Sequence, residues 1–134
     1  MKRHTIVATV VVLLGAPACG STLAPDRALG SKTDTLTWSL TNSINASVDV
    51  RFFDETYGNW YPSRTAFYPL NPGDNHVYEL QCSANANICY GATVHSNQNQ
   101  FFGVSVYNDQ QCSSQGCCHV CDGSVLTPIS LSAR

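Results

Sequence analysis

The stretch that decides the fold class is LTWSLTNSINASVDVRFF, residues 36–53. In residues 36–40, leucine and tryptophan alternate with hydroxyl-bearing side chains, which is the period of two expected of a half-buried β-strand. Residues 48–52 repeat this period, with valine and phenylalanine on one face and Asp49 and Arg51 on the other. Because one face of such a strand packs on a core while the other meets solvent, we predict two strands whose charged side chains are directed outward.

The same alternation continues through the chain in short runs separated by turn residues, and no window has a helical period. A polar hairpin loop is expected at residues 95–100. Together with the first two, about seven strands are predicted, a number that is typical of a small antiparallel β-sandwich, with an open β-barrel as the alternative. The further strands are expected near residues 65–68, 78–82, 88–94, 102–106 and 124–131.

The last predicted strand differs from the others because it contains a proline. Proline donates no backbone hydrogen bond, so Pro128 indicates an edge strand or a bulge. We expect the opposite face of this strand to be turned to the core, and that face carries Val125, Thr127, Ile129 and Leu131.

The first residues have the pattern of a secretory signal peptide. Lys2 and Arg3 precede an apolar run at residues 6–14, and small residues follow up to Ala18. The run is too short to cross a hydrocarbon layer about 30 Å thick, and no second apolar run of that length follows. We therefore predict a signal peptide at residues 1–18 and an exported mature chain without a transmembrane helix.

Cys19 directly follows the predicted cleavage site, as the acylated cysteine of a bacterial lipoprotein does. Ala16 and Pro17 depart from the usual lipobox, and ordinary cleavage after Ala18 with no lipid is the alternative. The chain has seven cysteines, an odd number for an exported protein, and a lipid on Cys19 leaves six that can pair. We expect lipidation at Cys19 and a flexible tether, rich in small residues and proline, over residues 19–34.

Composition limits what the mature chain can bind. Of the 134 residues only 12% are charged, and the net charge is -2. Removal of Lys2 and Arg3 leaves five cationic against nine anionic residues, a net charge of -4 with no basic cluster to attract nucleic acid. Membrane contact is therefore expected only through the lipid anchor. Residues 35–134 form one domain's length of chain, which we predict to be the β-sandwich.

Six cysteines remain for this domain, and they fall into two groups. The first group is Cys82 and Cys89, and the second is Cys112, Cys117, Cys118 and Cys121. In an oxidising compartment such cysteines form disulfides, so three bridges are expected to staple the sandwich. Adjacent residues meet disulfide geometry only with strain, which makes the pair Cys117–Cys118 the least favoured. The other connectivities stay open, and one scheme links the first group with the second.

A metal site is the alternative for the second group. Thiolate and imidazole ligands at a spacing close to that of zinc sites are offered by Cys112, Cys117, Cys118, Cys121 and His119. A complete CxxC…CxxC signature is absent, however, and exported thiols normally oxidise before they bind zinc. We therefore predict no metal and no cofactor, with a Cys-cluster metal-binding protein as the alternative function.

No sequence motif outlines a catalytic centre. The histidines of the mature chain, His76, His95 and His119, lie in no G-x-S-x-G, H-E-x-x-H or phosphate-loop motif. No catalytic residue is therefore predicted. A non-enzymatic role is preferred, and a small secreted hydrolase is the second alternative.

Three aromatic residues, Tyr57, Trp60 and Tyr61, are the candidate binding residues. They occupy one predicted loop, and exposed aromatic side chains often hold sugars or protein partners. The other interpretation is that they plug one end of the sandwich, since large aromatic side chains are mostly buried. The partner that this loop predicts is a surface ligand, either protein or carbohydrate.

Several short motifs resemble small exported proteins of bacteria that consist of a single cysteine-containing β-domain. The motifs are LTN at residues 40–42, L-x-PG at 70–73, NICYGA at 87–92, FFGV at 101–104 and C-x4-CC-x2-C at 112–121. This resemblance implies export and a β-fold, and it implies no activity. We expect a module of the bacterial cell envelope with a structural or ligand-binding role, placed as an outer-membrane lipoprotein or as an extracellular or periplasmic protein.

Overall fold

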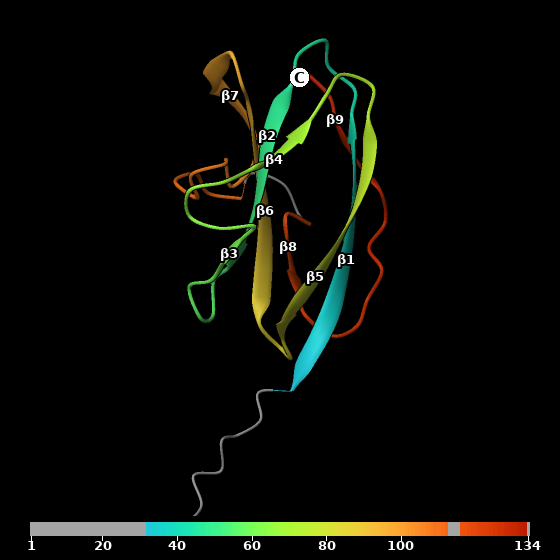
Figure 1. The fold of residues 1–134 in the computed structure, drawn as a ribbon, viewed down its shortest axis with the longest axis vertical. Coiled ribbons are helices and arrows are strands. Elements are labelled where there is room, and N and C mark those ends of the chain that lie inside the picture. Colours follow the sequence, from blue (N-terminus) through green and yellow to red (C-terminus); the bar gives the residue numbers. More distant parts are fainter. Residues whose placement is uncertain (1–31, 113–115, 134) are drawn as a thin grey trace, which may run out of the picture.

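The computed structural model describes residues 32–112 and 116–133. Every regular element in this part of the chain is a β-strand, and the strands form two sheets that face each other (Figure 1). The predicted β-sandwich is therefore confirmed, and the chain does not form the barrel of the alternative. Within the described residues, no helix has the length and apolarity needed to cross a membrane. The predicted signal peptide, Cys19 and residues 20–31 of the predicted tether lie outside the described residues.

The smaller sheet has the strand order β5 (Asn75–Ser83), β1 (Thr33–Asn42) and β9 (Ile129–Leu131). The larger sheet has the order β3 (Trp60–Tyr61), β2 (Val48–Asp54), β6 (Asn87–Val94) and β7 (Asn97–Gly103). Two short strands complete the larger sheet, β4 (Tyr68–Leu70) beside β2 and β8 (Cys118–Val120) beside β6. The strand pairings are antiparallel except for that of β9, which runs parallel to β1.

The core lies between the two sheets and is built from the alternating faces that the sequence predicted. The apolar positions of β1 and β2 are fully buried, and they are Leu36, Trp38, Leu40, Val48, Val50 and Phe52. The ring of Trp38 packs on those of Phe52 and Tyr90 at centroid distances of 5.6 and 5.5 Å. β5 and β6 add their predicted inward faces to the same cluster. In β1 and β5, therefore, the period of two reports burial directly, whereas in β2 and β6 it marks only the face that is turned to the core.

β1 begins at Thr33, two residues before the predicted start of the domain at Thr35. Thr33 pairs with Ser83, and Asp34 pairs with Cys82 of β5. The last two residues of the predicted tether therefore belong to the sheet. Their side chains are polar, so the hydrophobic pattern does not mark them, whereas the backbone pairing with β5 does.

Two predictions for the middle of the chain are wrong. The single strand predicted at residues 65–68 is replaced by β3 and β4, which both pair with β2. The predicted hairpin loop at residues 95–100 is mostly strand, because the turn takes only residues 95–96 before β7 begins. β7 ends at Gly103, where φ is +62° and a Cβ would lie 2.1 Å from a backbone oxygen of β6. The chain turns away there, so the strand predicted at 102–106 does not continue.

The C-terminal prediction is only partly right. Of residues 124–131, only the last three form a strand, and β9 does lie at a sheet edge directly after Pro128. Val125 makes one isolated bridge with β1, but its side chain is 78% exposed, and Thr127 is exposed as well. The inward face predicted for these two residues is therefore wrong. β8 has no counterpart among the predicted strands.

The outer face of the larger sheet is covered, which the alternation did not predict. Arg51 is only 4% exposed, so the prediction of a solvent-facing charge at this position is wrong. The cause is that the connections at residues 55–67 and 104–112 fold back over the side of β2 and β6 that is turned away from β1 (Figure 1). A second apolar cluster forms beneath them, made of Phe53, Cys89 and Val104 with Trp60 and Cys118.

Candidate functional site

The three aromatic residues predicted to bind a ligand do not form one exposed platform. Tyr57 lies in the turn after β2 and is 62% exposed. Trp60 and Tyr61 form β3 and are half-buried. Tyr61 packs on the main core, and the ring of Trp60 meets that of Phe53 edge-on at a centroid distance of 4.8 Å. Two of the three side chains thus have packing roles, and Tyr57 stands apart from them.

Arg51 fastens the two covering connections to the sheet. Its Nε donates a hydrogen bond to the backbone oxygen of Ala66 at 2.7 Å, and one terminal nitrogen donates to that of Val106 at 3.3 Å. The guanidinium also lies 4.4 Å from the ring centre of Phe67 and 5.4 Å from that of Trp60. Burial lowers the pKa of this guanidinium from its ordinary value. Its hydrogen bonds and ring contacts are internal, so Arg51 stabilises the fold.

All six cysteines of the domain are paired, as predicted. The bridges are Cys82–Cys121, Cys89–Cys118 and Cys112–Cys117. The first two connect the two cysteine groups of the sequence and tie β5 and β6 to the segment that carries β8. The adjacent residues Cys117 and Cys118 belong to different bridges, as expected from disulfide geometry. Three disulfides in so small a domain are typical of an oxidising compartment.

The ligands of the alternative metal site are divided among these bridges. The Sγ atoms of Cys112, Cys117 and Cys118 lie within 4.8 Å of one another, whereas Cys121 is bonded to a cysteine of β5. The Nε2 atom of His119 is 3.0 Å from a backbone oxygen, with which it shares a hydrogen bond. Zinc is held by thiolates, and a disulfide sulfur carries no such charge. The oxidised protein thus gathers three of the five predicted ligands but does not offer their thiolates.

The histidines of the described residues lie on different elements. His76, at the start of β5, packs on a tyrosine ring of its own strand at 4.6 Å. The Nδ1 atom of His95, a residue whose side chain is 71% exposed, pairs with the carboxylate of Asp49 at 2.9 Å. His119 in β8 meets the ring of Trp38 edge-on at 5.2 Å. Within these described contacts, none sets a nucleophile beside a histidine base.

A groove runs along one open side of the sandwich, between β7 and β8 of the larger sheet and β9 of the smaller one. It consists of two hollows of about 680 and 470 Å³, which share Tyr90 and Ile129. These volumes lie in the range of about 300 to 1,000 Å³ that is typical of ligand sites. The first hollow is further lined by Asn99, Gln100, Phe101, Phe102 and Ser130, and the second by His119, Ser124, Leu126 and Thr127.

The groove exists because β9 is short. Only Ile129–Leu131 pairs regularly with β1, whereas residues 124–128 pass along the sheet edge with a single bridge. The smaller sheet is therefore narrower than the larger one on this side. It leaves the rings of Tyr90 in β6 and Phe102 in β7 at the border of the groove.

Aromatic rings, neutral polar groups and aliphatic side chains make up the groove wall. Tyrosine, phenylalanine and histidine residues lie beside the amides of β7, the hydroxyls of the C-terminal segment, and the aliphatic residues Val125, Leu126 and Ile129. Among the described residues that line the groove there is no Asp, Glu, Lys or Arg. The wall can therefore donate and accept hydrogen bonds and stack on an apolar face.

Trp38 lies behind this wall. Its ring centre is 5.5 Å from that of Tyr90 and 5.2 Å from that of His119, and both of these residues line the groove. Within the described part of the chain, the buried Nε1 of Trp38 has no hydrogen-bond partner. Any shift of the two groove rings changes the surroundings of this indole, so Trp38 reports on the groove from inside the core.

The sequence pattern did not single out the groove residues, apart from His119 as an alternative metal ligand. The run NQNQFF at residues 97–102 consists of four amide side chains followed by two aromatics, and it was interpreted as a hairpin loop followed by a strand. The serine- and threonine-containing segment at 124–131 was interpreted as an edge strand or a bulge. Amides next to aromatic residues in this run could have indicated a binding site. Only the pairing of β7 with β6, however, places these residues opposite the C-terminal segment.

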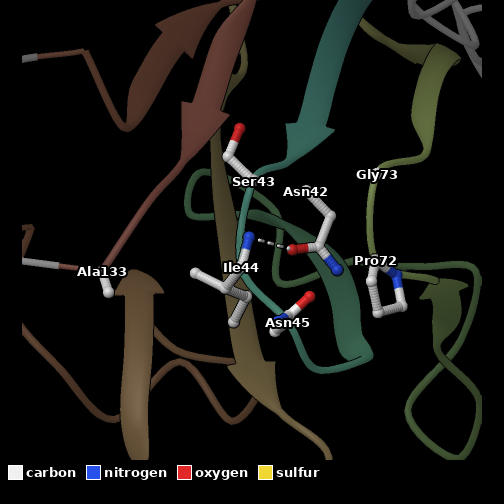
Figure 2. A pocket seen from close by; sticks show the side chains of 7 residues that line it. All are labelled: Asn42, Ser43, Ile44, Asn45, Pro72, Gly73 and Ala133. Atoms are coloured by element: carbon white, nitrogen blue, oxygen red, sulfur yellow. Dashed lines mark hydrogen bonds between the residues drawn. The ribbon is translucent and has the colours of Figure 1, made fainter.

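A further hollow lies at the end of the sandwich where the described chain ends, and Figure 2 shows its lining. Asn42, between the turn after β1 and the turn before β5, is fully buried here. Its amide nitrogen donates to the backbone oxygens of Ala46 and Leu70 at 2.8 and 3.0 Å, and its oxygen accepts from the backbone nitrogen of Ile44 at 3.1 Å. The polar atoms of Asn42 are thus taken up by hydrogen bonds that hold two turns together, so Asn42 has a structural role in this hollow.

Comparison with known proteins adds no assignment. No protein-family model, no curated protein and no solved structure matches this chain.

Proposed function

We propose that this protein is an exported, non-enzymatic β-sandwich module that binds a neutral carbohydrate in the groove between β7, β8 and β9. The observation that carries the proposal is the composition of the groove wall, in which rings lie beside amides and hydroxyls. Sugars present apolar C–H faces that stack on aromatic rings, and hydroxyls that pair with amide and hydroxyl side chains. A neutral sugar needs no countercharge, and the described lining provides no cationic or anionic residue.

The shape of the site favours a chain over a compact ligand. The two hollows adjoin along the sheet edge and share Tyr90 and Ile129, so one ligand can occupy both. The groove also lies on strands that the disulfides hold, because Cys89–Cys118 joins β6 to β8. A rigid site loses little conformational entropy on binding, which suits the weak individual contacts that sugars make.

Export and anchoring form the second part of the proposal. Three disulfides support an oxidising compartment, and the signal-peptide pattern at residues 1–18 supports export. We place the lipid on Cys19, so that the module is held at the bacterial cell envelope as an outer-membrane lipoprotein. Release into the periplasm or the medium follows if Cys19 carries no lipid. The motif resemblance to small exported β-domains of bacteria supports the same location.

The test is titration calorimetry of the oxidised protein with cellohexaose and N-acetylchitohexaose as neutral probes and hexagalacturonate as the anionic probe. We expect saturable binding of at least one neutral oligosaccharide and none of the anionic one. Gln100→Ala and Phe102→Leu should each weaken binding about tenfold or more, since about 1.4 kcal/mol is one decade in Kd. A change in Trp38 fluorescence should accompany binding, because this indole lies behind the groove wall.

The matched control is Tyr57→Ala, which removes an exposed aromatic ring away from the groove. This variant should bind as the unsubstituted protein does. If Tyr57→Ala loses affinity and the two groove variants keep it, the ligand binds at the aromatic loop predicted from the sequence. If neither neutral oligosaccharide binds at millimolar concentration, the carbohydrate proposal is wrong.

A further inference from the structure

Two of the disulfides lie together at the beginning of β8. Cys112–Cys117 and Cys89–Cys118 are separate bridges. Even so, the Sγ atoms of Cys112, Cys117 and Cys118 all lie within 4.8 Å of one another. A thiolate released from the first bridge is therefore already within 4.8 Å of a sulfur of the second.

Access from solvent differs sharply among these sulfurs. Cys112 is exposed, whereas Cys117 is 0% exposed and Cys89 is 2% exposed. Both ends of the remaining bridge, Cys82 and Cys121, are buried to the same degree, with exposures of 2% and 0%. Thiol–disulfide exchange requires that the attacking thiolate reach a disulfide sulfur. An external thiol therefore has its best access at Cys112.

We propose that Cys112–Cys117 is a thiol–disulfide exchange site that takes electrons from an external dithiol and passes the exchange on to Cys89–Cys118. A thiolate of the dithiol attacks the Sγ of Cys112. The bond to Cys117 breaks, and its electron pair goes to the Sγ of Cys117, which takes up a proton. The second thiolate of the dithiol then attacks its own sulfur in the mixed disulfide. This step oxidises the dithiol to a cyclic disulfide and releases Cys112 as a thiolate.

In the relay step, the thiolate of Cys112 attacks the Sγ of Cys118. The Cys112–Cys118 bond forms, the Cys89–Cys118 bond breaks, and its electron pair goes to Cys89, which is protonated in its apolar surroundings. Cys117 is the poorer attacker, because a bridge between adjacent residues meets disulfide geometry only with strain. The relay is an isomerisation without net reduction, and it leaves thiols on Cys89 and Cys117.

The experiment follows the thiols in time. The folded, oxidised protein receives one equivalent of dithiothreitol, and samples are quenched in acid. They are then alkylated with N-ethylmaleimide under denaturing conditions and mapped by peptide mass spectrometry. We expect label on Cys112 and Cys117 first, followed by loss of label from Cys112 and its gain on Cys89. The Cys82–Cys121 bridge should stay unlabelled throughout. Label that stays on Cys112 and Cys117 would overturn the relay, and early label on Cys82–Cys121 would overturn the entry point.

A double variant, Cys112→Ser with Cys117→Ser, removes the entry bridge. In this variant the same dithiol should open the Cys89–Cys118 bridge at least tenfold more slowly than in the unsubstituted protein. Equal rates would show that the dithiol attacks Cys89–Cys118 directly, and the relay would be refuted. The labelling of the unsubstituted protein decides the proposal even if the variant folds poorly. The outcome does not depend on which ligand occupies the groove.

Discussion

Replacing Arg51 by alanine removes a side chain that hydrogen-bonds to both covering connections. The backbone oxygen of Val106 loses its buried hydrogen bond and that of Ala66 a partly buried one. An unsatisfied buried carbonyl costs about 1 to 3 kcal/mol, and the partly buried one costs less. The stacked rings of Phe67 and Trp60 lose cation–π contacts of about 0.5 to 1 kcal/mol each. Because these losses share one side chain and do not add fully, we expect about 3 to 5 kcal/mol of destabilisation.

The assay is urea unfolding of the oxidised protein, followed by tryptophan fluorescence. The free energy of unfolding of Arg51→Lys should lie between those of the unsubstituted protein and Arg51→Ala. Lysine keeps the charge but lacks the planar guanidinium that reaches two carbonyls and stacks on rings. Arg64→Ala is the matched control: Arg64 is exposed and its guanidinium lies 5.3 Å from the ring centre of Trp60, so its loss should cost less than about 1 kcal/mol. If Arg51→Ala costs no more than Arg64→Ala, the two connections do not depend on the buried guanidinium and the reasoning fails.

Two other predictions concern buried groups. Burial raises the pKa of Tyr78 from 10.0 to about 12, and its hydroxyl has no hydrogen-bond partner within the described part of the chain. The stability that this raised pKa contributes is present below pH 10.0 and is lost as the pH rises toward about 12. In Tyr78→Phe, the free energy of unfolding should therefore fall less steeply with pH in this alkaline range, and it should not be lower at pH 7. A disulfide that closes a longer loop restricts the unfolded chain more, and the sequence separations are 39 for Cys82–Cys121 and 5 for Cys112–Cys117. Replacing each pair by alanine should therefore lower the free energy of unfolding by about 4 and about 2 kcal/mol, respectively. Calorimetry of both double variants checks the order, and a reversed order would contradict the chain-entropy argument.

The sequence by itself determined the fold class and the composition of the core. In β1 and β5 side chains alternate between a buried and a more exposed face, so a local period of two is enough to name the buried residues, and in β2 and β6 it names the face that is turned to the core. The number of cysteines likewise predicted three bridges, and the strain of an adjacent pair made Cys117–Cys118 the least favoured pairing. These properties depend on residues that are close together in the chain, so the sequence contains them directly.

Only the tertiary structure decided the burial of Arg51, the disulfide connectivity and the position of the groove. Arg51 is buried by Ala66 and Val106, which lie 15 and 55 residues away in the chain. The groove likewise joins β7 to a C-terminal segment that reached the sheet edge by pairing with β1. Such contacts arise from how sheets and connections stack in space. A period of two along one strand carries no information about which distant segment will cover its outer face.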